Sequence, residues 1–229
     1  VSRVINNKKG IKKETKERIQ RILEECNYSP NEAARGLVNQ ASKIIGILIS
    51  DIRTTHHTEG VYYMEREFEK LGYCCIIMNA GGDEESKSRY IKILNQRRVE
   101  AAVLIGSTFQ CDSVKKAIQA YLPNTPVIIS NGYMDLPNVY GVMSDEQNGI
   151  LNCVKLLADK GRKNLAFVID KYTPSNKLKL LGFEMGVRQW CDQNKPLVVE
   201  TKSTFKDAYD TTIELVKQHP EVNGIIYVV

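Results

Sequence analysis

The chain has 229 residues, of which 42% are hydrophobic and 26% are charged, as in an ordinary globular protein. Its longest apolar runs, such as residues 44–49, are far too short to cross a bilayer, and the N-terminus carries no apolar secretory signal. The formal net charge is +5, and residues 1–43, with ten basic and five acidic side chains, hold all of this excess. A basic end on a neutral body indicates a module that binds a polyanion, joined to a second function.

Short helices are expected in the first 43 residues. Residues 1–6 look like the tail of a helix, and a second helix is predicted over about 13–26. Its expected buried stripe consists of Ile19, Ile22, Leu23 and Cys26. Lys12 stands at the N-cap of this helix, where its side chain cannot accept the free backbone amides. The segment 31–38 is predicted to be a helix too short to be stable alone, and therefore a candidate for ordering on binding.

From residue 44 onward, short apolar runs alternate with amphipathic stretches. The expected strands are 44–49, 73–78, 101–106, 126–130, 164–169, 197–200 and 224–229, with a further extended piece at 139–143. The expected helices are about 59–71, 84–98, 112–121, 145–160, 175–193 and 207–218. Strands that are apolar at consecutive positions are typical of a parallel sheet buried on both faces. The alternation predicts a doubly wound α/β body with right-handed crossovers.

Local signals add detail to this body. Gly72 and Gly161 are expected to end helices, and Asp145 is a plausible helix N-cap. The buried stripe expected on the first of these helices consists of Val61, Met64, Phe68 and Leu71. In doubly wound sheets, ligands bind at the carboxyl ends of the strands. The candidate ligand loops are therefore 50–58, 79–83, 107–111, 131–138 and 170–176.

The six cysteines are expected to be reduced, mostly buried thiols of a cytosolic protein. They include no CxxC pair, and neighbours such as Cys74 and Cys75 point to opposite faces of a strand. The adjacent His56 and His57 have no second cluster of metal ligands, so neither a metal nor a cofactor is expected. The sequence contains no GxSxG, GxxxxGK[ST] or strand-linked GxGxxG motif. An enzyme is therefore not expected.

An ordered set of fragments resembles the bacterial repressor family typified by the lactose and purine repressors. The matching stretches are VSRVINN at 1–7, ETKERI at 14–19, YSPN at 28–31, AARGL at 33–37 and IGI at 45–47. The resemblance covers essentially the whole chain and is vaguer after residue 60. It implies a partial helix-turn-helix headpiece at 1–29 and a hinge helix with linker at 30–43. It further implies an effector domain like the periplasmic binding proteins, with subdomains at 44–160 and 161–229. By the same resemblance, the chain is expected to be truncated at both ends.

The resemblance also assigns candidate DNA-binding residues. Val1, Ser2 and Arg3 match the base-facing half of a recognition helix, where the planar fork of arginine suits a guanine edge. Asn6 and Thr15 match positions that contact the DNA backbone. In the hinge helix, Leu37 matches a residue that wedges into the minor groove. The hinge residues Asn31, Ala34 and Arg35 lie beside it.

Candidate ligand residues follow from the predicted pocket between the two subdomains. The full set is Asp51, Thr54, Thr55, His56, Asn79, Asn131, Asp145, Tyr172 and Lys179. Lys179 stands where the family usually has an arginine on a sugar or base, and lysine lacks that bidentate fork. The usual Asn-Pro-aromatic pattern after Asp51 is replaced by Arg53 and the residues that follow it. A ligand geometry different from that of the family's typical members is therefore expected.

The sequence predicts a cytoplasmic, dimeric DNA-binding transcriptional regulator, most simply a repressor, controlled by a sugar or related metabolite. Ligand binding is expected to change subdomain closure and hinge spacing, and so to shift DNA affinity. No membrane partner is expected. The main alternative is a stand-alone sugar-binding protein of the periplasmic type, which shares the α/β body but binds no DNA. A nucleoside- or sugar-processing α/β enzyme is the second alternative.

Overall fold

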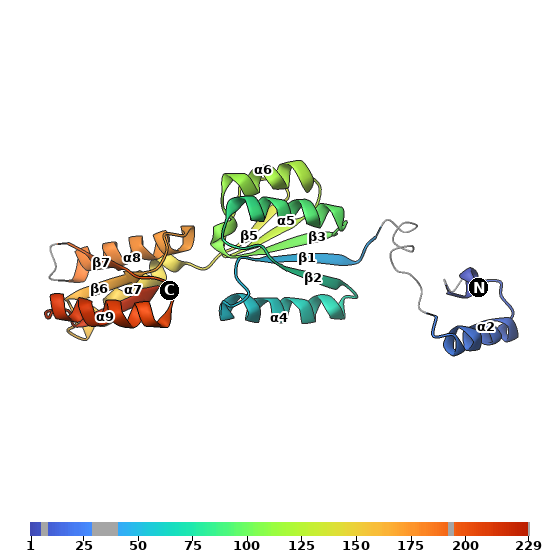
Figure 1. The fold of residues 1–229 in the computed structure, drawn as a ribbon, viewed down its shortest axis with the longest axis horizontal. Helices are drawn as coiled ribbons and strands as arrows, with labels where there is room; N and C mark the ends of the chain where they lie inside the picture. The colour runs from blue at the N-terminus through green and yellow to red at the C-terminus, as the bar shows by residue number, and fades with distance from the viewer. Residues whose placement is uncertain (6–8, 29–40, 192–194, 229) are drawn as a thin grey trace. The chain divides into compact units, whose positions relative to one another are not determined.

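The computed structural model describes residues 1–5, 9–28, 41–191 and 195–228. It divides the chain into two compact units, residues 1–43 and residues 44–229, which are drawn in Figure 1. The hinge segment predicted at 31–38 lies outside the described residues.

Two helices make up the described part of the first unit. They are α1 (Ser2–Ile5) and α2 (Lys13–Glu25), which confirms the predicted helix over 13–26 to within a residue. Lys12 has the extended backbone of an N-cap residue, with φ −61° and ψ 141°, and its side chain makes no capping bond. The helix ends just before Asn27, whose φ of 48° lies in the left-handed region. The prediction that the Lys12 side chain cannot cap α2 is confirmed.

The predicted burial of the α2 stripe is wrong. Ile19 and Leu23 are only partly covered, Cys26 is exposed, and Ile22 keeps 47% of its surface in solvent. The described part of this unit offers α2 only the four-residue α1 as a packing partner, in which Val4 is buried. A stripe spread over three turns needs a longer facing element, so most of it stays in contact with water.

The second unit contains two parallel sheets, as expected. The first sheet has the order β2-β1-β3-β4-β5 and the second the order β7-β6-β8. The strands of the first sheet are β1 (Ile44–Ile49), β2 (Cys74–Asn79), β3 (Ala101–Ile105), β4 (Val127–Ser130) and β5 (Val139–Val142). Its connections are α4 (Thr55–Lys70), α5 (Glu84–Gln96), the 3-10 turn η1 (Ser107–Phe109) and α6 (Asp112–Tyr121).

Alternate residues of each strand enter two different cores of the first sheet. Ile47 packs toward Val61 of α4, whereas its neighbour Leu48 packs toward Ile91 of α5 and Ile118 of α6. Figure 1 shows α4 on one face of this sheet and α5 with α6 on the other. The consecutive apolar residues of β1 are thus explained by helices on both faces, as predicted.

The second sheet is built in the same way. Its strands are β6 (Leu165–Ile169), β7 (Leu197–Glu200) and β8 (Gly224–Val228), and its helices are α7 (Glu146–Asp159), α8 (Pro174–Trp190) and α9 (Phe205–Gln218). Phe167 of β6 stacks on Phe183 of α8, with ring centroids 4.9 Å apart, and Val154 of α7 joins this core. Leu215 of α9 packs against the opposite face.

Helix α7 packs directly against α8. A Cβ placed on Gly182 of α8 would lie 2.1 Å from the carbonyl oxygen of Gln147, and one on Gly186 would lie 2.7 Å from Cβ of Val154. Only glycine allows the backbones to approach so closely. Because α7 shares a core with the second sheet, these contacts argue for a subdomain boundary before α7 rather than at residue 160.

Three local expectations need correction. Leu71 follows the last turn of α4 and is 67% exposed, so it does not continue the stripe of Val61. Helix α4 begins at Thr55, four residues before its predicted start, which places Thr55 and His56 in the helix instead of the loop. The six cysteines are free, but three are exposed and three are partly covered, so the expectation of mostly buried thiols is wrong. These thiols lie on helix surfaces, on an edge strand and near helix ends, where packing from one side only is available.

Candidate functional site

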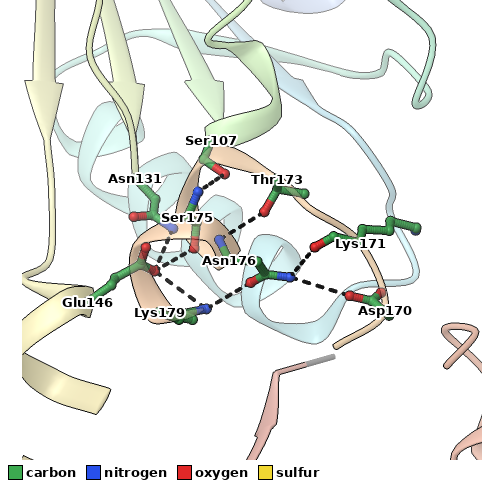
Figure 2. A network of polar contacts seen from close by, with 9 residues as sticks. All are labelled: Ser107, Asn131, Glu146, Asp170, Lys171, Thr173, Ser175, Asn176 and Lys179. Carbon is green, nitrogen blue, oxygen red and sulfur yellow. Dashed lines mark hydrogen bonds and ion pairs between the residues drawn. The ribbon is translucent and has the colours of Figure 1, made fainter. Parts of the chain in front are cut away.

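A polar side chain that contacts residues of both sheets is Glu146, the first residue of α7. Its side chain is only 10% exposed. Oε1 accepts hydrogen bonds from Ser175 Oγ at 2.7 Å and from Asn131 Nδ2 at 3.2 Å, and Lys179 Nζ lies 3.5 Å away (Figure 2). Asn131 belongs to the first sheet, whereas Ser175 and Lys179 belong to α8 of the second. One carboxylate therefore joins the two halves of this unit.

The start of α8 is fixed by its local sequence. Thr173 caps the helix by accepting from the backbone amide of Asn176 at 3.2 Å, and Pro174 occupies the first turn, where its missing N–H costs nothing. The next backbone amide, that of Ser175, donates to Ser107 Oγ at 3.2 Å. Ser107 begins the turn η1 after β3. This bond gives a second link between the two sheets.

Asn176 extends the network toward the second sheet. Its Nδ2 donates to the carbonyl of Lys171 at 2.9 Å and to Asp170 Oδ1 at 3.4 Å, while its Oδ1 lies 3.4 Å from Lys179 Nζ. Asp170 also accepts a short hydrogen bond from Ser203 Oγ. Figure 2 shows these side chains gathered around the first turns of α8. We refer to Ser107, Asn131, Glu146, Asp170, Ser175, Asn176 and Lys179 as the polar network.

The polar network lies where sheet topology places a ligand site. Asn131 and Asp170 directly follow β4 and β6, and Ser107 follows β3 after Gly106, so each stands at the carboxyl end of a parallel strand. Asn131 has a φ of 62°, and its backbone amide donates to the carbonyl of Val142 at 2.7 Å, which holds its side chain at this edge. Carboxylates, amides, hydroxyls and one ammonium group offer both donors and acceptors to a ligand rich in hydroxyl groups.

The loop after β1 is organised by an ion pair. Asp51 accepts from Arg53 through both carboxylate oxygens, at 2.9 and 2.7 Å, and these bonds hold the pKa of Asp51 well below its usual range. Thr54 precedes α4 without a side-chain capping bond, and Thr55 and His56 are exposed in the first turn. The hydrogen bonds and ion pairs of the described residues do not connect these four candidates to the polar network. Their role stays a prediction.

His57, beside the predicted His56, has the more constrained environment. Its Nδ1 is buried and, among the described residues, without a hydrogen-bond partner. Burial holds the pKa of His57 below its ordinary value. The ring packs over Gly106, where an added Cβ would lie 3.3 Å from Nε2, and Gly106 has a φ of 116° that favours glycine. Two adjacent histidines look alike in the sequence, so His57 could not be preferred over His56 before the structure was known.

The other predicted ligand residues are distributed around this edge. Asn131 and Lys179 belong to the polar network, as described above. Asp145 is exposed and caps α7 through the backbone amide of Asn148, and its bonds to Asn148 hold the pKa of Asp145 below its ordinary value. Tyr172 donates to Glu200 at 2.9 Å, which raises the pKa of Tyr172, and Asn79 is exposed at the end of β2. These three stay predictions.

Sequence reasoning missed five members of the polar network. Glu146 follows Asp145, which was correctly predicted to cap the helix, but periodicity did not show that this next acid faces inward. Ser175 and Asn176 are buried at the start of α8, inside a stretch already singled out for Lys179. The remaining two, Ser107 and Asp170, lie in predicted ligand loops. A search for polar residues directly after predicted strands would have found these two.

The DNA-binding candidates of the first unit are only partly described. Val1 and Thr15 are exposed, and Arg3 is exposed while its Nη2 donates to the carbonyl of Lys9 at 3.1 Å. Ser2 begins α1, but its side chain is outside the description. The remaining candidates lie outside the described residues: Asn6, Asn31, Ala34, Arg35 and Leu37. All of these assignments stay predictions.

Among the described residues, no three or more histidine, cysteine, aspartate or glutamate side chains gather in a way that could hold a metal ion. None of the helices described combines the length and the apolar character that a membrane crossing requires.

Comparison with known proteins gives consistent matches along the chain. Residues 42–229 match the family described as periplasmic binding proteins and sugar binding domain of LacI family, and residues 1–31 match the bacterial regulatory proteins of the lacI family. An HTH-type transcriptional regulator of Lachnoclostridium phytofermentans is 32% identical over 99% of this chain and 69% of its own length. The ribose operon repressor of Halalkalibacterium halodurans is 26% identical over 98% of this chain and 66% of its own.

Solved structures agree on the fold. A lac repressor dimer bound to operator and an anti-inducer superposes with a TM-score of 0.86 at 19% identity, covering 99% of this chain and 68% of that one. A complex of the regulator CelR with cellobiose gives a TM-score of 0.68 at 16% identity, with the same coverage. Together with the two family matches, which cover both the basic N-terminal unit and the α/β unit, these findings place the chain: it belongs to the LacI family of bacterial regulatory proteins.

Proposed function

We propose that this LacI-family transcriptional regulator binds a sugar-like effector at the polar network and changes its affinity for operator DNA in response. The observation that carries the proposal is the bonding of Glu146, whose carboxylate takes donors from both sheets. A ligand that competes for these donors would alter how the two halves of the α/β unit are held together. Its differential affinity for two arrangements would then shift their populations.

The chemistry of the site fits a polyhydroxylated ligand. Asp170 and Glu146 can accept hydrogen bonds from hydroxyl groups, and Asn131 and Lys179 can donate to them. We retain the predicted ligand residues as part of the proposal: Asp51, Thr54, Thr55, His56, Asn79, Asn131, Asp145, Tyr172 and Lys179. We add Glu146, Asp170 and Asn176. Relatives support this class of ligand, since one is named a ribose operon repressor and solved relatives contain cellobiose in one case and fructose 1-phosphate in another.

For DNA binding, we propose the surface that carries Val1, Ser2, Arg3, Asn6 and Thr15. The hinge residues Asn31, Ala34, Arg35 and Leu37 complete it. The excess positive charge of residues 1–43 supports this proposal, because neutralisation of phosphates supplies most non-specific affinity for DNA. We further propose a homodimer on a two-fold symmetric operator, by analogy with the relatives. A cytoplasmic location and the absence of enzymatic activity follow from a role on DNA and belong to the same proposal.

Fluorescence anisotropy with an operator selected from a random-sequence library tests DNA binding. We expect the affinity to fall steeply with salt, and Arg3→Ala to weaken binding by about tenfold or more because a base contact is lost. Arg97→Ala, an exposed arginine at the end of α5, is the matched control and should have little effect. A chain that binds sugars but selects no DNA would favour the stand-alone sugar-binding protein instead.

A test for conversion of a bound sugar to product distinguishes the proposed regulator from an enzyme. Incubation of the chain with any sugar that binds, followed by mass analysis of the sugar, should return it unchanged. A stoichiometric excess of product would contradict the proposed role.

A further inference from the structure

The charges of the polar network define what its ligand can carry. The network contains two carboxylates, Glu146 and Asp170, and one ammonium group, that of Lys179. Asp170 accepts only from neutral donors, Asn176 and Ser203, among the described residues. With the exposed Lys171 beside Asp170 included, two carboxylates face two ammonium groups, so the site carries no net positive charge.

The ammonium group of Lys179 already has two partners, an ion pair with Glu146 and a hydrogen bond to Asn176. Glu146 Oε1 lies 3.5 Å from Nζ and Asn176 Oδ1 lies 3.4 Å from it, and the Lys179 side chain is only 28% exposed. In the loop after β1, Arg53 is similarly occupied, because it donates two parallel hydrogen bonds to Asp51. Each of these cations is thus compensated by a carboxylate of the protein itself.

We propose that the site selects uncharged sugars and rejects their phosphate esters; this inference rests on the proposed sugar-binding function. A phosphate dianion would have to displace Glu146 from Lys179, and would then face the displaced carboxylate and that of Asp170 in a partly dry environment. An uncharged sugar can instead donate hydroxyl protons to both carboxylates, which accept but do not donate. Glu146 therefore sets the charge of the accepted ligand, and Lys179 positions it.

Isothermal titration calorimetry of the full chain tests the inference with paired probes. The pairs are D-ribose with D-ribose 5-phosphate, D-glucose with D-glucose 6-phosphate, and D-fructose with D-fructose 1-phosphate; cellobiose is added as a larger neutral sugar. We expect saturable binding of at least one uncharged sugar. The phosphate ester of that sugar should bind at least tenfold more weakly, a difference in binding free energy of about 1.4 kcal/mol. If cellobiose is the sugar that binds, all three phosphate esters should bind at least tenfold more weakly than cellobiose.

Two substitutions should move this preference in opposite directions. Glu146→Gln keeps the shape of the side chain but frees Lys179, so the tenfold preference should shrink or reverse. Lys179→Gln removes the positive charge and should widen the preference. Glu184→Gln is the matched control, since Glu184 pairs with Arg188 at 3.6 Å on the same helix but lies outside the network. Circular dichroism melts establish that each variant is folded. If Glu146→Gln does not fold, the change in preference caused by Lys179→Gln tests the inference alone.

The outcomes separate the two proposals. Tighter binding of a phosphate ester than of its parent sugar by the native chain would overturn the charge inference and leave the proposed sugar site intact. A preference that neither Glu146→Gln nor Lys179→Gln changes would also overturn it. Binding of neither class would contradict the proposed sugar-binding function, and the inference would fall with it.

Discussion

The contact between α7 and α8 allows a quantitative prediction at Gly182. The substitution Gly182→Ala introduces a Cβ 2.1 Å from the carbonyl oxygen of Gln147, more than 1 Å inside the roughly 3.5 Å at which non-bonded heavy atoms normally meet. The obstructing atom belongs to the backbone of another helix and cannot rotate away. Overpacking of this kind costs about 1–3 kcal/mol, from which a helix-propensity gain of about 0.5–1 kcal/mol must be subtracted.

A second glycine gives the matched control. Gly149 lies in α7 with no atom within 4 Å of an added Cβ, so Gly149→Ala should gain about 0.5–1 kcal/mol from helix propensity alone. After the propensity gain common to both variants cancels, Gly182→Ala should be the less stable by about 1–3 kcal/mol. For a chain of this size, that corresponds to a difference in Tm of about 2–12 °C, measured by circular dichroism at 222 nm.

The two glycine variants also test whether the packing of α7 against α8 affects sugar binding. Helix α7 carries Glu146 and helix α8 carries Ser175 and Lys179, so forcing the helices apart should lengthen the bonds within the polar network. We therefore expect Gly182→Ala, but not Gly149→Ala, to weaken sugar binding as well. Equal melting temperatures for the two variants would refute the packing argument, because both substitutions are otherwise identical.

Three further predictions concern separate features. Burial holds the pKa of His57 below its ordinary value of 6.5, so the unfolded chain takes up the proton more readily and stability should fall as the pH drops below about 6.5. His57→Gln should flatten this fall in Tm, and a fall of the same size in the variant would contradict the assignment to His57. Lys87 is buried and donates to a backbone carbonyl at 2.9 Å, so Lys87→Met should lower the free energy of unfolding in urea by about 1–3 kcal/mol. Lys92→Met, on the exposed face of the same helix, should change the free energy of unfolding by less than about 0.5 kcal/mol. Lys12→Ser supplies the missing cap of α2 and should stabilise that helix by about 1 kcal/mol, a gain that Lys12→Ala, which removes the same charge, should not give.

The arrangement of the α/β unit could be predicted because its signals are local. Residues 44–49 and 101–105 are apolar at consecutive positions, and such strands need helices on both faces. Gly72 and Gly161 have φ angles of 77° and 76°, as expected of glycines that end helices. The start of a helix was predicted less well where no capping side chain marks it. Helix α4 begins at Thr55, and Thr54 before it makes no side-chain capping bond.

Burial and side-chain partners could not be predicted in the same way. The exposure of Ile22 and Leu71 depends on which elements face them, and sequence periodicity identifies a face without identifying its partner. The same limit applies to Glu146, whose three partners come from residues 131, 175 and 179. Contacts across this range of sequence are set by how the two sheets meet, which the order of residues alone does not specify.

Occupancy of the polar network is proposed to control the affinity of the chain for DNA. Fluorescence anisotropy of the selected operator, measured with and without a sugar that binds in calorimetry, tests this coupling. We predict that saturating sugar changes the Kd for DNA by about fivefold or more, in the range typical of allosteric coupling, and that Lys179→Ala abolishes the change while DNA binding persists. A Kd for DNA that stays the same with saturating sugar would rule out this coupling, since both sites would then be present without acting on each other.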